Sequence, residues 1–252
     1  MALLASSASR AASSNAAAAP VPAEPPRFAE CMDLATGDPA RGQTNAIAWR
    51  SEGGGALARQ CLGVSYANQQ RWESAATAFA DAAREAELGK QPKVAEYWVQ
   101  SGNAWLAAGD AAKARAAFDA ALATASLTGL ALGEAHLDRA RALVLTGDGE
   151  AARGDIDKAL LHAPADPLAW LLSATLARRA NDLPRAARDI AEALKRAPDD
   201  ASVQFEAGNI AAAAGDEANA RTAWARAIEL APGGPLAESA RKALEQFATT
   251  EK

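Results

Sequence analysis

His136 and His162 are the only histidines in this 252-residue chain, and neither stands in a pattern that indicates catalysis. No Ser/His/Asp or Cys/His set is suggested around them, and no HExxH sequence occurs. His162 lies two residues before Pro164, at the expected end of a helix, where a cation is mildly stabilising. With no catalytic residues suggested, we expect a protein that is not an enzyme.

The clustered acidic residues and the glycine run are more typical of structure than of chemistry. Asp148, Glu150, Asp155 and Asp157 lie close together in sequence. Such a set more often caps a helix and covers its solvated face than it binds a metal. The glycines at 53–55 lack the following Lys-Ser/Thr of a phosphate-binding loop, so we interpret them as a hinge. The sequence predicts no metal and no cofactor.

Cys31 and Cys61 leave two interpretations open. They can be two small buried hydrophobic side chains, which suits a helical interior. They can also form one disulfide, which is favoured if the chain is exported. The disulfide requires the two helices that carry them to lie side by side, with Cα atoms within about 7 Å. No CxxC or Cys/His spacing occurs, so a zinc site is not expected.

Composition indicates a chain of closely packed helices. Lys and Arg number 26 against 31 Asp and Glu, a net charge of −5, so there is no basic footprint and no nucleic-acid partner is expected. The apolar fraction is 50% but aromatic residues are only 5%, because much of the apolar content is alanine, the best helix former. No apolar run reaches the roughly 18 residues of a transmembrane helix.

The N-terminal segment, residues 1–27, is rich in Ala, Ser and Pro and carries few bulky side chains. We expect it to be disordered, since it cannot bury enough apolar surface to offset the loss of chain entropy. It lacks the basic region and the long apolar stretch of a complete secretory signal. It could be the remnant of a signal that starts upstream, in which case the protein is periplasmic or otherwise exported; without one it is cytoplasmic.

A 34-residue repeat organises most of the chain. The stretch GDEANARTAWARAIELAPGG begins at Gly215, and similar stretches begin at Asn181 and Gly147. In each, a Gly-Asp or Asn-Asp turn precedes an apolar pattern of helical spacing that ends at Ala-Pro. A first helical pattern precedes each turn, so one unit predicts a helix hairpin. The chain contains five such units: 56–89, 95–128, 133–166, 167–200 and 201–234. Five residues are inserted between the first and second units, and four between the second and third.

The repeat resembles the tetratricopeptide repeat family in its length and in where large and small residues fall within each unit. Trp98 and Trp170 hold position four of their units, and Leu62, Gly63 and Tyr66 match the core of a first helix. Phe79, Phe118 and Trp224 hold position twenty-four. The resemblance implies an all-α, right-handed α-α superhelix of about five helix hairpins, whose concave face is lined by the first helices.

The sequences that flank the units predict caps for the array. Residues 28–55 keep a Gly-Asp turn and a Pro39 helix start, which indicates a degenerate helix pair over the first unit. Residues 235–252 begin with a proline and carry several charged side chains on one side, which indicates a solvating C-terminal helix and tail.

The resemblance also selects first-helix positions that would line a partner-binding groove. Asn103 and Asn209 could bond an extended peptide backbone, because an amide both donates and accepts. Apolar anchors would come from Leu137, Leu171 and Phe205, and Arg141 or Arg178 would pair with an acidic group of the partner. The carboxylate-clamp variety of the family is not expected, because Gln60, Cys61 and Val64 replace its Lys/Arg and Asn. The predicted groove residues are Gln60, Val64, Asn103, Leu137, Arg141, Leu171, Arg178, Phe205 and Asn209.

Taken together, these patterns favour a non-catalytic scaffold that binds a protein or peptide partner on the concave face of a repeat array. If the chain is exported from a bacterial cytoplasm, a role in cell-envelope assembly or trafficking would fit. One alternative is a polysaccharide- or lipid-binding module, which would need an aromatic-lined groove, and Phe205 alone is thin support for it. The other is an accessory subunit of an enzyme complex.

Overall fold

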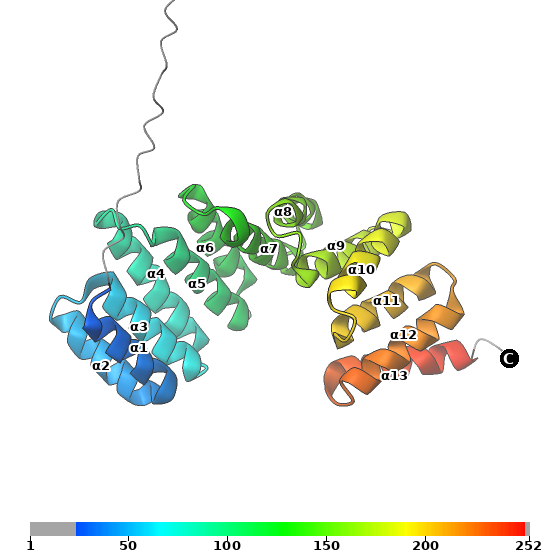
Figure 1. Ribbon diagram of the computed structural model, residues 1–252, viewed down its shortest axis with the longest axis horizontal. Coiled ribbons are helices and arrows are strands. Elements are labelled where there is room, and N and C mark those ends of the chain that lie inside the picture. Colours follow the sequence, from blue (N-terminus) through cyan, green and yellow to red (C-terminus); the bar gives the residue numbers. More distant parts are fainter. Residues whose placement is uncertain (1–23, 250–252) are drawn as a thin grey trace, which may run out of the picture.

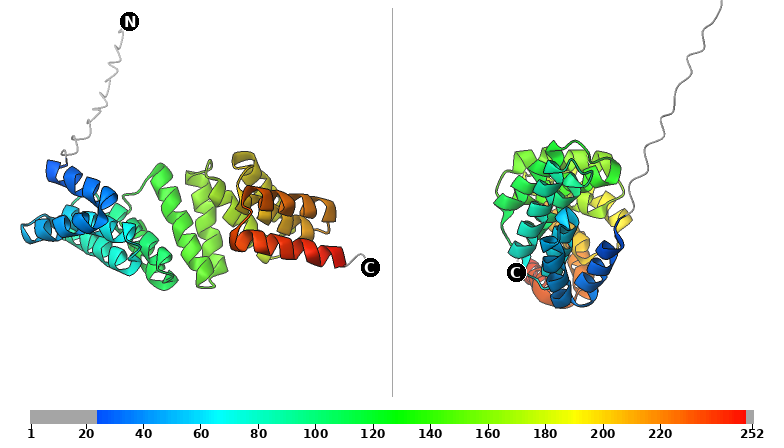
Figure 2. Two further views of the ribbon diagram at one scale, coloured as in Figure 1. Left: turned by 90° about the horizontal axis from the view of Figure 1, so that it is seen from below. Right: turned by 90° about the vertical axis from the view of Figure 1, so that its left-hand side faces the viewer.

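The computed structural model describes residues 24–249, which form thirteen α-helices. Most of the segment expected to be disordered, residues 1–23, lies outside the described residues. Helix by helix, the chain folds back on itself into an extended curved array, with the N-terminal helices at one end and α13 at the other (Figure 1; Figure 2). No helix in residues 24–249 is long and apolar enough to span a membrane.

Five consecutive helix hairpins form the body of the array. Within each hairpin the two helices pack along their length, and each second helix also contacts the first helix of the next hairpin. The hairpins are α3 (Gly55–Asn68) with α4 (Trp72–Leu88), α5 (Val94–Ala107) with α6 (Ala111–Ala123), α7 (Gly129–Leu145) with α8 (Gly149–His162), α9 (Pro167–Arg179) with α10 (Leu183–Arg196), and α11 (Ala201–Ala213) with α12 (Glu217–Leu230).

Three first helices begin earlier than the repeat units do; one of them, α3, begins at Gly55, one residue before its unit. The four residues at 129–132, read from the sequence as an insertion between units, form the first turn of the 17-residue helix α7. Leu130, Ala131 and Leu132 are strong helix formers, and nothing in this stretch stops the helix from starting at Gly129. Similarly, α5 begins at Val94, one residue before its unit.

In four of the five hairpins, two adjacent residues with different tasks build the turn. The first adopts positive φ, which glycine does without steric cost: φ is 80° at Gly109, 83° at Gly147 and 79° at Gly215. Asn181 does the same at 58°. The following aspartate accepts a hydrogen bond from the backbone N–H three residues later and so caps the second helix. These caps are Asp110, Asp148, Asp182 and Asp216. In the first hairpin Gln70 has the positive φ (57°), and Arg71 after it makes no side-chain cap.

The two helices of a hairpin approach closely where position eight of the first helix meets position twenty-four of the second. A Cβ atom added to Gly102 would lie 2.6 Å from the ring of Phe118, and one added to Gly208 would lie 2.4 Å from the ring of Trp224. Gly63 faces Phe79 in the same way, at 2.5 Å. Where the large residue is isoleucine, position eight is alanine instead, in the pairs Ala140 with Ile156 and Ala174 with Ile190. The volumes at the two positions are therefore matched.

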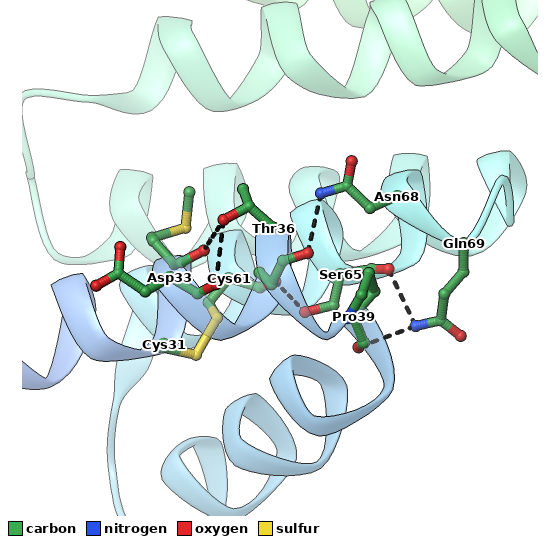
Figure 3. Close-up of a disulfide and its surroundings, with 10 residues drawn as sticks. Cys31, Asp33, Thr36, Pro39, Cys61, Ser65, Asn68 and Gln69 are labelled. Atoms are coloured by element: carbon green, nitrogen blue, oxygen red, sulfur yellow. Dashed lines mark hydrogen bonds between the residues drawn. A yellow bond between two sulfur atoms is a disulfide. The ribbon is translucent and has the colours of Figure 1, made fainter.

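A helix pair, α1 (Pro26–Gly37) and α2 (Pro39–Ser51), covers the first hairpin. Cys31 on α1 and Cys61 on α3 form a disulfide, with Cα atoms 6.1 Å apart and both side chains fully buried (Figure 3). Beside it, the side-chain amide of Asn68 donates to the carbonyl oxygen of Ala35 (2.9 Å). The cross-link spans a sequence separation of 30 residues, for which the loss of unfolded-chain entropy stabilises the fold by about 3 to 4 kcal/mol.

At the other end, α13 (Gly234–Thr249) covers the last hairpin. On α13, Ala237 and Ala240 are fully buried, and Phe247 packs edge-on to Trp224 of α12 with ring centroids 5.2 Å apart. The other side of α13 carries exposed charged residues, among them Glu238 and Lys242. The helix thus closes the apolar end of the array and presents a polar surface.

The matched volumes at positions eight and twenty-four yield a prediction. Gly102→Ala places a methyl group against Phe118 and should lower the free energy of unfolding by about 1 to 3 kcal/mol. Gly154→Ala, also within a helix, has open space around its Cβ, so it should be neutral or raise stability by up to about 1 kcal/mol. Urea denaturation followed by circular dichroism measures both. Equal effects of the two substitutions would contradict the close-approach interpretation.

Candidate functional site

A cavity of about 490 Å³ opens on the array where the first helices α5, α7 and α9 adjoin. On α5 the lining residues are Glu96, Val99, Gln100 and Asn103, at the spacing i, i+3, i+4, i+7 of a single helix face. The same face of the other two helices completes the wall. The remaining lining residues are Leu127, Ala131, Glu134, Leu137, Asp138, Asp166 and Leu168.

A second compartment of about 240 Å³ continues from the first toward the C-terminus, between α9, α11 and the start of α13. Leu168 lines both cavities, so they adjoin at this side chain, and we refer to the two together as the groove. We call the cavity at α5, α7 and α9 the acidic compartment and the second one the apolar compartment. The apolar compartment is lined by Leu168, Leu171, Leu172, Thr175, Ser202, Phe205, Glu206 and Leu236.

Four of the residues predicted for a groove line these two compartments. Asn103 is exposed and Leu137 is buried in the wall of the acidic compartment. Leu171 and Phe205, both half-buried, line the apolar compartment. The structure therefore brings these four together along one surface.

Two predicted residues, Gln60 and Val64, lie on the N-terminal hairpin and do not line either compartment. Gln60 is buried, and its side-chain Nε2 donates to Oε1 of Gln100 (3.3 Å). Val64 is partly buried and packs against two core clusters, one that contains the disulfide cysteines and one that contains Phe79. Neither offers a side chain to a partner, because the cap helices and the next hairpin cover this part of α3.

Arg178 and Asn209 lie on the first helices but already have intramolecular partners. The guanidinium of Arg178 donates two hydrogen bonds to the buried carboxylate of Glu206, at 2.7 and 3.2 Å. The amide of Asn209 donates to Glu206 (3.1 Å) and accepts from the indole N–H of Trp224 (3.1 Å). The sequence analysis expected Arg178 to offer a free cation and Asn209 a free amide to a partner. In the structure both side chains are instead engaged within the chain.

The acidic compartment has the opposite charge to the basic spot expected from the sequence. Glu96, Glu134, Asp138 and Asp166 line it, and its described lining includes no Lys or Arg. Arg141, the other predicted cation, is exposed and donates to Asp138 on its own helix (2.9 Å). The sequence did carry a signal for this charge, because Glu96 and Glu134 both stand at position two of their units.

A buried polar network lies directly behind the groove wall, next to Leu137. Asp155 on α8 is 2% exposed; it accepts two hydrogen bonds from Arg139, at 2.6 and 2.7 Å, and a third from His136 (3.0 Å). A carboxylate only accepts, so His136 carries its proton on Nδ1. Arg139 also bonds Asp119 of the preceding hairpin (2.7 Å). The interpretation of Asp155 as part of a solvated face is therefore wrong.

Burial sets the charge state within this network. Desolvation lowers the pKa of His136, outweighing the opposing effect of the Asp155 carboxylate. The hydrogen bond to Asp155 raises the pKa of Arg139. The network is thus a neutral imidazole and an ion pair that join three helices. Within residues 24–249, no group of three or more His, Cys, Asp or Glu side chains is placed to hold a metal ion.

A helical-repeat array with a groove along its first helices is the class of protein that this geometry defines. A family described as tetratricopeptide repeat matches residues 62–127, 137–189 and 171–235. The chain therefore belongs to the tetratricopeptide repeat family. No curated protein sequence matches it.

Several solved structures share the fold. One is PilW, described as a widely conserved type IV pilus biogenesis factor, with a TM-score of 0.68 and 21% identity over 84% of this chain and 96% of that chain. Pseudomonas aeruginosa pilF has a TM-score of 0.66 and 14% identity, covering 90% and 98%. YrrB, described as a TPR protein with an unusual peptide-binding site, has a TM-score of 0.57 and 19% identity, covering 78% and 96%.

The buried histidine predicts a pH dependence of stability. As pH falls below the ordinary histidine pKa of about 6.5, the unfolded chain takes up a proton at His136 while the folded chain, with its lowered pKa, does not. This contribution to stability is therefore fully present above this pH and is lost progressively as the pH falls below it. His136→Gln should reduce this fall, measured by urea denaturation over this pH range. A fall that persists unaltered in His136→Gln would contradict the assignment.

Proposed function

We propose that the protein is a non-catalytic scaffold that binds an extended segment of a partner protein in the groove formed by α5, α7, α9 and α11. The groove itself carries the proposal: two adjoining compartments that share Leu168 run along the first helices. They combine apolar side chains with exposed polar ones, which is the usual composition of a recognition site. The amide of Asn103 is exposed on the α5 wall of this surface and can bond a peptide backbone.

The relatives support the same function at the level of analogy. YrrB is described as having a peptide-binding site, and PilW as a pilus biogenesis factor. At 21% identity or less, these likenesses show the fold, so a role of this chain in assembling cell-envelope structures is our proposal. The Cys31–Cys61 disulfide favours it, because disulfides persist in exported proteins and are rare in the cytosol.

The composition of the groove favours a peptide over a polysaccharide or a lipid. A polysaccharide-binding surface would present several aromatic faces, and Phe205 is the single aromatic residue among the described lining of the two compartments. The five tryptophan and tyrosine side chains that stack against cations all do so outside this lining: Trp49, Tyr66, Trp98, Trp105 and Trp170.

The proposal predicts that a bulky residue in the groove blocks peptide binding. A random peptide library displayed on phage is selected on the immobilised chain, and the affinities of selected peptides are measured by isothermal titration calorimetry. Ala131→Trp fills the acidic compartment from the exposed start of α7 and should weaken binding about tenfold or more, a loss of at least about 1.4 kcal/mol.

The matched control is Ala112→Trp, which adds the same side chain at an exposed position near the start of the second helix α6. It should leave the affinity unchanged within about twofold. Selected peptides whose affinity survives Ala131→Trp, or falls equally in both variants, would show that the groove is not the binding surface.

A further inference from the structure

The charge of the groove indicates what kind of segment it binds. Glu96 and Glu134 are exposed on its wall, and neither has an ion-pair partner among the described residues. They lie on adjacent first helices, at the same position of consecutive units. An occupant must therefore pass between two uncompensated carboxylates, which would repel an acidic segment and attract a basic one.

The other two carboxylates of the acidic compartment are only partly engaged. Asp166 accepts a hydrogen bond from the backbone N–H of Leu168 (2.8 Å) and so caps α9. Asp138 is paired with Arg141, three residues along the same helix, whose side chain is 45% exposed. Pairs of this kind at the surface contribute at most about 1 kcal/mol, so a cation of the partner can compete for Asp138.

The arrangement of these carboxylates fits an organic cation rather than a metal ion. They are distributed over α5, α7 and the cap of α9, and no group of them among the described residues is placed to hold a metal. A Lys or Arg side chain reaches carboxylates that are spread out in this way, because its charge is at the end of a long flexible stem. On the same wall, the exposed amide of Asn103 can bond the backbone that carries it, as can the amide nitrogen of Gln100, whose oxygen already accepts from Gln60.

The apolar compartment adds a second requirement. Its walls are mainly Leu171, Leu172, Phe205 and Leu236, and Glu206 at its edge is neutralised by Arg178. Packed helices lie about 8 to 10 Å apart, so the centres of the two adjoining compartments lie about 10 to 20 Å from each other. An extended chain advances about 3.3 Å per residue, which places about three to six residues between the two contacts.

We propose that the occupant of the groove is a basic segment that places a Lys or Arg side chain in the acidic compartment and a large apolar side chain in the apolar compartment, about three to six residues away. This inference rests on the proposed function of the groove and names the chemistry of its partner. It reverses the expectation of an acidic partner, since the two arginines on which that expectation depended are paired within the chain.

The test uses the full chain and the displayed peptide library. Selected peptides should be enriched in Lys or Arg followed or preceded, at the stated spacing, by a large apolar residue. For the best peptide, the double variant Glu96→Gln/Glu134→Gln should weaken binding about tenfold, measured by isothermal titration calorimetry. Raising the salt concentration should weaken binding to the original chain much more than binding to this variant.

A matched pair of substitutions controls for net charge. Glu150→Gln/Glu217→Gln removes the same charge from exposed positions in the first turns of the second helices α8 and α12, and it should leave the affinity unchanged. Two results would overturn the basic-segment inference and leave the groove function standing. In the first, peptides whose binding is blocked by Ala131→Trp lack basic residues. In the second, such peptides bind the Glu96→Gln/Glu134→Gln variant as tightly as the original chain. If no peptide is blocked by Ala131→Trp, both fail.

Discussion

The contact on which the rest of the structure depends is the close approach of the two helices within each hairpin. A small residue at position eight must face the large one at position twenty-four, and the sizes are matched: glycine against Phe79, Phe118 and Trp224, alanine against the two isoleucines. A single hairpin is too small to bury its own apolar face, so each one is completed by its neighbours. The helix pair α1–α2, which the Cys31–Cys61 disulfide joins to α3, and the helix α13 provide that completion at the two ends.

This constraint separates the residues that build the array from those available to a partner. The large residues of the second helices are buried inside the hairpins, and the turn residues cap helices. What remains accessible on the first helices is the face with positions two, five, six and nine, which carries the groove. The repeat leaves these positions free to vary in charge, and in this chain they make one end of the groove acidic and the other apolar.

The sequence predicted the hairpins, their turns and the residues at close approach, because each of these depends on residues within one unit. It was less successful where side chains from different units meet. The Arg178–Glu206 pair joins residues 28 apart, and Asp155 is buried by Arg139, which also reaches Asp119 of the previous hairpin. Such pairs depend on how successive hairpins are rotated, which the repeat pattern alone does not specify. Leu137 and Phe205 line the two compartments, as their places on one helix face suggest, and their role in binding stays a prediction. Arg178 and Asn209 also lie on first helices, but the helix face alone does not specify their partners.

The central claim is that partners bind along the first helices rather than on the second helices. It is tested most directly by photo-crosslinking the full chain to a library-selected peptide that carries a benzophenone side chain, followed by mass spectrometry of the joined fragments. We predict crosslinks to residues of α5, α7, α9 and α11, with Val99, Asn103 and Leu168 among them. Crosslinks confined to the second helices α6, α8 and α10 would contradict the account.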